Sequence, residues 1–188
     1  MAMPSMHVEW TVDMLDALED DGQRYELVDG ELFVTPAPSL IHQFVVGELF
    51  ALLREFLRRV PVGKPVTSPA DVRRGDRARN RVQPDVFVLR LTDGKHPPYP
   101  FDLSDLLLAV EVSSPSNPRL DYHVKRELYL REGVREYWVL NPEARNVSRW
   151  RGKDGPGELF SEVLTWQPEG ADEPFVLTLE KFFEDALR

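Results

Sequence analysis

The run Leu106-Leu107-Leu108-Ala109-Val110-Glu111-Val112 is almost continuously apolar, and Glu111 is its one charged residue. An apolar run of this length between turn residues is typical of a strand that is buried on both faces of a sheet. Burying an unpaired carboxylate costs free energy, so a glutamate near the end of such a strand needs a partner. Glu111 is therefore a candidate functional residue.

The segments on either side of this run predict a sheet with a crossover helix. A strand over 86–91 precedes the run, and a helix over 119–132 and a strand over 136–140 follow it. If 86–91 pairs antiparallel with the run, Asp85 and Glu111 lie at the same end of the sheet. A right-handed crossover would make 136–140 parallel to the run and would bring Lys125, in the early turns of the helix, toward Glu111.

The remaining segments predict one domain around a mixed sheet. An Asp29-Gly30 turn predicts a hairpin over 24–34, with Glu26 opposite Phe33. The other expected elements are helices over 12–18 and 39–60, strands over 66–72, 147–151, 159–166 and 175–179, and a short final helix. We expect a single α/β or α+β domain over 1–188, with a disordered lead-in over 1–10 and a β extension over 143–188.

Composition excludes several classes of protein. The 188 residues include no cysteine, which rules out disulfides, thiolate zinc sites and cysteine nucleophiles and favours a cytoplasmic protein. No long uncharged apolar window predicts a membrane span. The net charge of −9 argues against nucleic-acid binding by the whole surface, although a local basic patch or an acidic site that works through a cation stays open.

Three acidic residues stand where the pattern would place apolar ones: Glu26, Asp85 and Glu111. Clustered carboxylates repel one another unless a cation joins them, and an oxygen-only ligand set suits Mg²⁺ or Mn²⁺. A divalent ion beside a lysine ammonium can catalyse phosphodiester hydrolysis, because the ion activates water and both cations neutralise phosphate charge. We expect Asp85, Glu111 and the Val112 carbonyl to hold the ion. Glu26 would orient the attacking water or complete the shell, and Lys125 would stabilise the developing charge.

Several motifs carry a resemblance to a known family. Pro84-Asp85 followed by Glu111-Val112-Ser113 resembles the PD-(D/E)XK nuclease motif, whose last position is normally lysine. The wider set resembles the Uma2-type restriction endonucleases over about 24–150. This set comprises Tyr25-Glu26-Leu27-Val28-Asp29-Gly30-Glu31-Leu32, Pro36-Ala37-Pro38-Ser39 with His42, Glu111-Val112-Ser113-Ser114-Pro115-Ser116, Asp121 with Lys125, and Gly133-Val134-Arg135-Glu136-Tyr137-Trp138-Val139-Leu140-Asn141-Pro142.

The resemblance implies a restriction-endonuclease-like core: a mixed central sheet flanked by helices. It also implies that the active-site lysine has moved to the following helix, where Lys125 matches that position. Glu26, Asp85 and Glu111 match the acidic positions of the family.

Other charged residues allow two interpretations each. An arginine-rich loop could clamp a phosphate backbone or form a solvated hairpin tip. Its arginines are Arg73, Arg74, Arg77, Arg79 and Arg81. We expect His42 to be a packed, hydrogen-bonded histidine rather than a catalytic one.

The sequence thus favours a metal-dependent endonuclease that hydrolyses DNA, for which a homodimer is plausible. One alternative is a catalytically silent binding or regulatory module that keeps the fold, because Ser113 occupies the usual lysine position. A second is a hydrolase that uses paired carboxylates without a metal, such as a glycosidase.

Overall fold

The computed structural model describes residues 8–35, 37–74, 77–114, 117–152 and 155–188. Residues 1–7 of the expected lead-in lie outside these ranges, as do Pro36, Pro115 and Ser116 of the quoted motifs.

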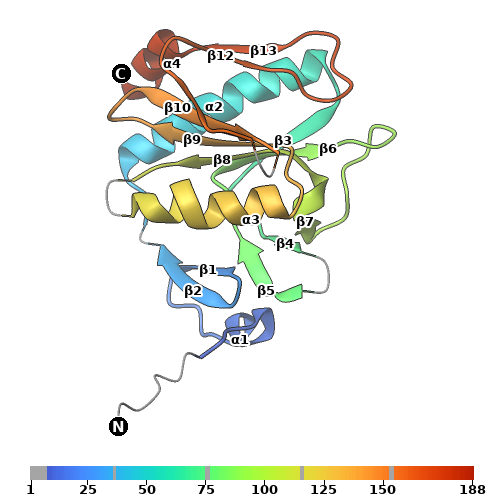
Figure 1. Cartoon of the computed structure of the whole chain (residues 1–188), viewed down its shortest axis with the longest axis vertical. Coiled ribbons are helices and arrows are strands. Elements are labelled where there is room, and N and C mark those ends of the chain that lie inside the picture. The colour runs from blue at the N-terminus through green and yellow to red at the C-terminus, as the bar shows by residue number, and fades with distance from the viewer. Residues whose placement is uncertain (1–7, 36, 75–76, 115–116, 153–154) are drawn as a thin grey trace.

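A six-stranded sheet in the order β11-β10-β9-β8-β6-β3 forms the centre of the molecule (Figure 1). Its strands are β3 (Gly63–Thr67), β6 (Val86–Arg90), β8 (Leu106–Val112), β9 (Glu136–Asn141), β10 (Asn146–Arg151) and β11 (Glu158–Phe160). All seven residues of β8 are buried, as the apolar run predicts. β8 pairs antiparallel with β6 and parallel with β9, so both predicted pairings are confirmed.

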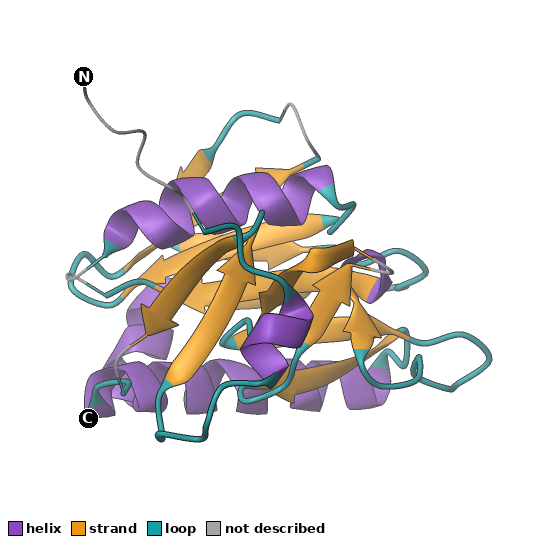
Figure 2. Ribbon diagram, turned by 90° about the horizontal axis from the view of Figure 1, so that it is seen from below, coloured by secondary structure: helices purple, strands orange, loops and turns teal. Residues whose placement is uncertain are grey.

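Helices cover both faces of this sheet (Figures 1 and 2). On one face α2 (Leu40–Arg59) and α4 (Leu179–Leu187) pack on the apolar side chains of one side of the strands. On the other face lies the crossover helix, which begins as a π-helical turn, η2 (Leu120–Lys125), and continues as α3 (Arg126–Arg131). Gly133 follows with a φ of +94°, a left-handed conformation suited to glycine at a helix end.

A second, five-stranded sheet in the order β2-β1-β5-β4-β7 lies below the first in Figure 1. Its strands are β1 (Arg24–Val28), β2 (Glu31–Thr35), β4 (Val72–Arg74), β5 (Arg77–Val82) and β7 (Phe101–Asp102). The short helix α1 (Val12–Asp16) packs beside it, and a 3-10 turn, η1 (Leu103–Asp105), follows β7. Glu26 lies opposite Phe33 in the β1–β2 hairpin, which confirms the register that the Asp29-Gly30 turn predicts.

Three sequence predictions were wrong in this part of the chain and near the C-terminus. The predicted strand over 66–72 is divided between β3 and β4, with Pro69 between them, which lacks the backbone N–H that a ladder needs. The arginine-rich segment forms the paired strands β4 and β5 rather than a loop. The predicted strand over 159–166 is divided between β11 and β12 (Val163–Trp166), and β12 pairs with β13 (Phe175–Thr178).

Within the described ranges, no helix combines the length and the apolar character needed to cross a membrane.

Candidate active site

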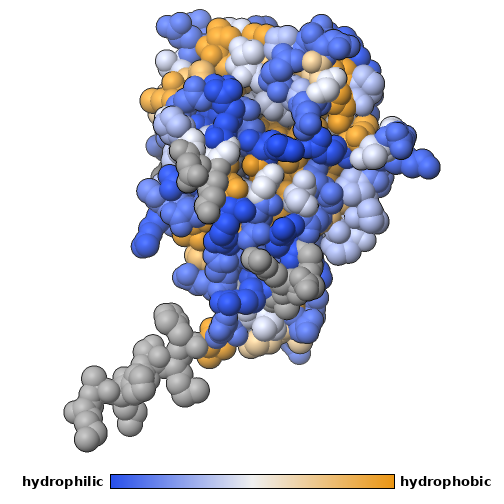
Figure 3. Space-filling view, turned by 45° about the vertical axis from the view of Figure 1, so that its right-hand side comes forward, coloured by the Kyte–Doolittle hydropathy of each residue, from blue (hydrophilic) through white to orange (hydrophobic). Residues whose placement is uncertain are grey.

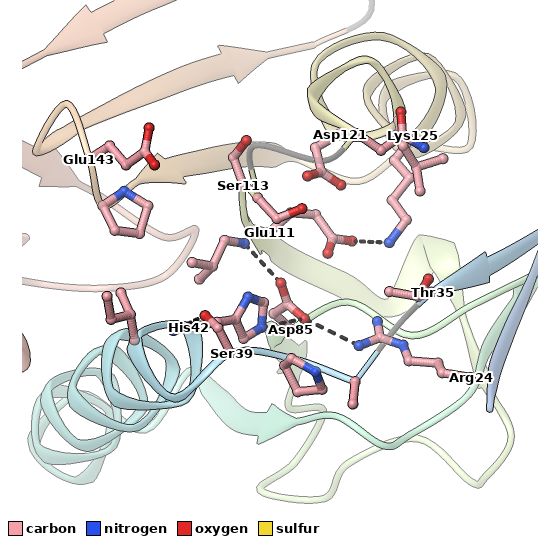
Figure 4. A pocket seen from close by; sticks show the side chains of 18 of the residues that line it. Arg24, Thr35, Ser39, His42, Asp85, Glu111, Ser113, Asp121, Lys125 and Glu143 are labelled. Carbon is pink, nitrogen blue, oxygen red and sulfur yellow. Dashed lines mark hydrogen bonds and ion pairs between the residues drawn. The ribbon is translucent and has the colours of Figure 1, made fainter. Parts of the chain in front are cut away.

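A cavity of about 440 Å³ opens where the N-terminus of α2, the end of β8 and the start of the crossover helix meet. Figure 4 shows the side chains that converge there from these elements and from β1 and β2. Its polar lining residues are Arg24, Thr35, Ser39, His42, Asp85, Ser113, Ser114, Glu111, Asn117, Asp121, Lys125 and Glu143. Segments far apart in the sequence therefore contribute to one hollow.

Lys125 joins two buried carboxylates. Its Nζ lies 2.8 Å from Glu26 Oε2 and 3.1 Å from Glu111 Oε1, and all three side chains are buried. Burial alone would lower the pKa of Lys125, but the charges of Glu111 and Glu26 outweigh it and raise that pKa above its ordinary value. Lys125 therefore remains an ammonium at any physiological pH.

Glu111 has a second donor on the same oxygen. The Tyr129 hydroxyl, one helical turn after Lys125, donates to Glu111 Oε1 at 2.7 Å. Burial raises the pKa of Glu111 well above its ordinary value, and the Lys125 ammonium opposes that rise. Both donors approach Oε1, so Oε2 has no hydrogen-bond partner among the described residues.

Asp85 is held from three sides at the start of β6. Its Oδ2 accepts the Val112 backbone N–H at 2.8 Å, and its Oδ1 lies 3.3 Å from Arg24 Nη1 and 3.2 Å from His42 Nε2. Burial would raise the pKa of Asp85, but the His42 hydrogen bond and the neighbouring cations lower it to about 2. The carboxylate is thus ionised throughout the physiological range.

Arg24 and Glu26 are two residues apart on β1, so their side chains share one face of the strand. Arg24 Nη2 donates to the Gln83 carbonyl and lies 3.6 Å from Glu26 Oε1, which accepts the Gln83 N–H at 2.7 Å. Glu26 is fully buried. It does not line the cavity and lies behind Lys125.

Asp121 is a largely buried acidic residue of the cavity whose carboxylate has no partner among the described residues. Its carboxylate makes no hydrogen bond or ion pair with the residues that the structure describes, whereas its backbone carbonyl accepts the Tyr137 hydroxyl at 2.9 Å. Burial, with the charges of Asp85 and Glu26, raises the pKa of Asp121 to about 6. At neutral pH the fold therefore carries a charge here that destabilises it.

Replacing Asp121 with asparagine is expected to raise the free energy of unfolding by about 1–3 kcal/mol at pH 8. The folded pKa of about 6 exceeds the ordinary value of 3.8, so wild-type stability falls as pH rises from about 4 to 6. The gain of the variant should therefore be absent below pH 4, as urea unfolding at several pH values would measure. An equal gain at pH 3.5 and pH 8 would contradict this origin.

The structure brings Asp85, Glu111, Val112 and Lys125 to one cavity, and Glu26 directly behind it. The catalytic and metal-binding roles of these residues stay predictions. Sequence reasoning missed Arg24 and Asp121 as site residues and treated His42 only as a packed residue. Useful signals were the two-residue spacing of Arg24 from Glu26, the four-residue spacing of Asp121 from Lys125, and the place of His42 in the first turn of α2, after the N-cap Ser39.

The arginines predicted to clamp phosphate lie elsewhere, on β4 and β5, and those whose side chains the structure describes pair with acids of the chain. Arg73 and Arg81 contact Asp16 and Asp71, Arg74 contacts Asp102 and Glu132, and Arg79 contacts Glu9. The side chain of Arg77 lies outside the described residues. Figure 3 shows a mostly hydrophilic face of the molecule. These pairs favour a structural role for the arginines, and the phosphate clamp stays a prediction.

The residues of the cavity fit a hard divalent cation. Five carboxylates lie in or beside it, those of Glu26, Asp85, Glu111, Asp121 and Glu143, against the two permanent cations Arg24 and Lys125. Within the described ranges no three His, Asp or Glu side chains are placed to hold a metal by themselves. An ion would therefore take its other ligands from water or phosphate oxygens, as Mg²⁺ commonly does.

Comparisons with known proteins identify a matching family and a matching fold. The family model Uma2, described as a putative restriction endonuclease, matches residues 12–187. A crystal structure described as a putative nuclease belonging to DUF820 from Anabaena variabilis superposes with a TM-score of 0.75. That chain is 19% identical, and the match covers 94% of this chain and 98% of the other. No curated protein matches the chain.

Proposed function

The chain belongs to the Uma2 family, described as putative restriction endonucleases, and we propose that it hydrolyses DNA phosphodiester bonds with the help of a divalent metal ion. The main support is the ammonium of Lys125, which is held between Glu26 and Glu111 at a cavity that Asp85 also lines. A buried ammonium beside carboxyl groups at the edge of a hollow, with the ionised Asp85 in its wall, matches what phosphoryl chemistry needs.

Glu111 and Asp85 would hold the ion, with the Val112 carbonyl and the Asp121 carboxylate as further oxygen donors. A bound Mg²⁺ or Mn²⁺ supplies neutralisation of phosphate charge and activation of the attacking water. The need for this cation follows from the charge of the site, in which acidic groups outnumber the permanent cations.

Lys125 stabilises the negative charge that develops on the phosphoryl oxygens during attack. Its Nζ already bonds two carboxylates, which leaves one of its three N–H groups for the substrate. Lys125 thereby takes the place of the usual motif lysine, which Ser113 replaces. The contacts of Glu26 favour a role in positioning Lys125 over the water-orienting role expected from the sequence.

The second candidate is a nuclease-fold module that binds without cleaving. The observation that favours it is the state of Asp85, both of whose oxygens already accept bonds from the chain itself. In such a module Arg24 and His42 would stay bound to Asp85 in the place that a metal ion would take. Metal affinity separates the two candidates.

Titration of Mn²⁺ into the protein by calorimetry is expected to give one saturable site that Glu111→Gln weakens by at least about tenfold. The exposed Glu127 provides a matched control, because Glu127→Gln lies outside the cavity and should leave binding unchanged. Wild-type protein that binds no Mn²⁺, with or without an added oligonucleotide, would favour the silent module. Cleavage that persists in a chelator would exclude the metal.

A further inference from the structure

Part of the cavity wall is apolar. Val34 of β2 and Ile41 of α2 form it together with Pro38, Leu120 and Pro142. Val34 is 49% exposed and Ile41 is 55% exposed, so solvent reaches the wall. Exposed apolar surface at the mouth of a site marks a place where a bound ligand or partner covers the protein.

The apolar surface continues out of the cavity along α2. Leu40 and Phe44 are 68% and 49% exposed, and Phe44 lies one turn after Ile41 on the same side of the helix. We call Val34, Leu40, Ile41 and Phe44 the entrance patch. Since Val34 and Ile41 also line the cavity, whatever covers the entrance patch reaches toward the carboxylates.

The basic side chains at the cavity form ion pairs with acidic side chains of the same chain. Arg24 contacts Asp85 and Glu26, Lys125 contacts Glu26 and Glu111, and His42 contacts Asp85. The described arginines of β4 and β5 are paired as well, and the chain carries a net charge of −9. Duplex DNA is bound chiefly by basic side chains on its phosphates, and this surface offers few such contacts.

A single strand of nucleic acid exposes the faces of its bases, which are stacked and covered in a duplex. Its bases expose apolar faces that pack on hydrophobic and aromatic side chains, and this contact tolerates any sequence. Asp85 is only 5% exposed and Glu111 only 2%, so the reacting phosphate has to enter the cavity with its sugar and base beside the apolar wall. A paired base cannot follow it without leaving the duplex.

We propose that the substrate is single-stranded nucleic acid whose bases pack on the entrance patch while one phosphate enters the cavity. This inference rests on the proposed nuclease function and specifies its substrate class. Apolar packing rather than phosphate contacts then supplies most of the affinity, so binding depends only weakly on salt.

Fluorescence anisotropy tests the inference with labelled oligothymidine and with its duplex with oligoadenine. The double variant Ile41→Ser/Phe44→Ser is the probe, and Leu159→Ser, at an exposed residue of β11, is the matched control. Wild-type protein should bind oligothymidine at least about tenfold more tightly than the duplex. The double variant should lose about tenfold in that affinity, and the control should lose none. Circular dichroism would verify that the helix content of each variant is unchanged.

Tighter binding of the duplex, or a double variant that binds oligothymidine like wild type, would overturn the inference. If the double variant differs from wild type only in its oligomeric mass in solution, the entrance patch is a contact with a second copy of the chain. That result would also overturn the inference. Cleavage is measured separately with Mn²⁺ on both probes. Failure to cleave either probe, despite patch-dependent binding of oligothymidine, would count against hydrolysis and not against the strand preference.

Discussion

Replacing Lys125 with methionine is expected to lower the free energy of unfolding by about 3–5 kcal/mol at pH 8 and to reduce cleavage by about 10²–10³-fold. Methionine keeps much of the volume but removes the ammonium. Glu26 and Glu111, which are 0% and 2% exposed, would then face each other without their shared cation. Two buried carboxylates in that position repel each other and remain poorly solvated.

The stability loss should depend on pH in a defined direction. Burial already raises the pKa of Glu111, and removal of Lys125 raises it further. The folded variant then retains a proton that the unfolded chain releases above about pH 4.3, so the stability of the variant falls as pH rises. Urea unfolding followed by tryptophan fluorescence should therefore show a smaller deficit at pH 5 than at pH 8.

Lys181 is the matched control for this experiment. It is 75% exposed and pairs with Asp185 on the surface of α4, so Lys181→Met should change neither stability nor cleavage noticeably. Equal deficits in the two variants, or a Lys125→Met deficit that is the same at both pH values, would mean that Lys125 does not neutralise the buried acids.

Replacing Asp85 with asparagine is expected to reduce metal-dependent cleavage by about 10²–10³-fold while the fold is retained. Asparagine keeps an oxygen that can accept the Val112 N–H but loses the negative charge that would bind a cation. Alanine is a poorer choice, because it would leave the Val112 N–H and the largely buried Arg24 without this acceptor. Initial rates on oligonucleotide substrates across a range of Mn²⁺ concentrations would measure the effect.

Asp71→Asn is the matched control for Asp85→Asn. Asp71 is also partly buried and contacts Gln83, but it lies outside the cavity beside Arg73 and Arg81. Its replacement should leave the rate within about twofold of wild type, as substitutions remote from reacting groups usually do. An Asp85→Asn variant that cuts as fast as wild type would remove Asp85 from the proposed site.

The three adjacent strands β6, β8 and β9 of the central sheet could be predicted because their signals are local or follow from handedness. The apolar run of β8 requires burial on both faces, and the crossover through the helix requires β9 to be parallel to it. The Asp29-Gly30 turn likewise set the β1–β2 register. The rest of the second sheet escaped prediction. The pairings of β1 with β5 and of β4 with β7 join distant segments, and β4 and β5 carry many arginines instead of a regular apolar pattern.

The acids of the candidate site stood out because a carboxylate in an apolar strand violates the local pattern, and Lys125 stood out through its place on the crossover helix. Periodicity, turns and misplaced charges are properties of neighbours along the chain, and to that extent the sequence alone determined the core and its acidic end. The tertiary structure decided which cation pairs with which acid, as with Arg24 and Asp85, which are 61 residues apart. It also decided that Arg73, Arg74, Arg79 and Arg81 pair with acids and that Asp121 pairs with no cation among the described residues. Ion pairing depends on distance in space and on burial, which only the folded chain defines.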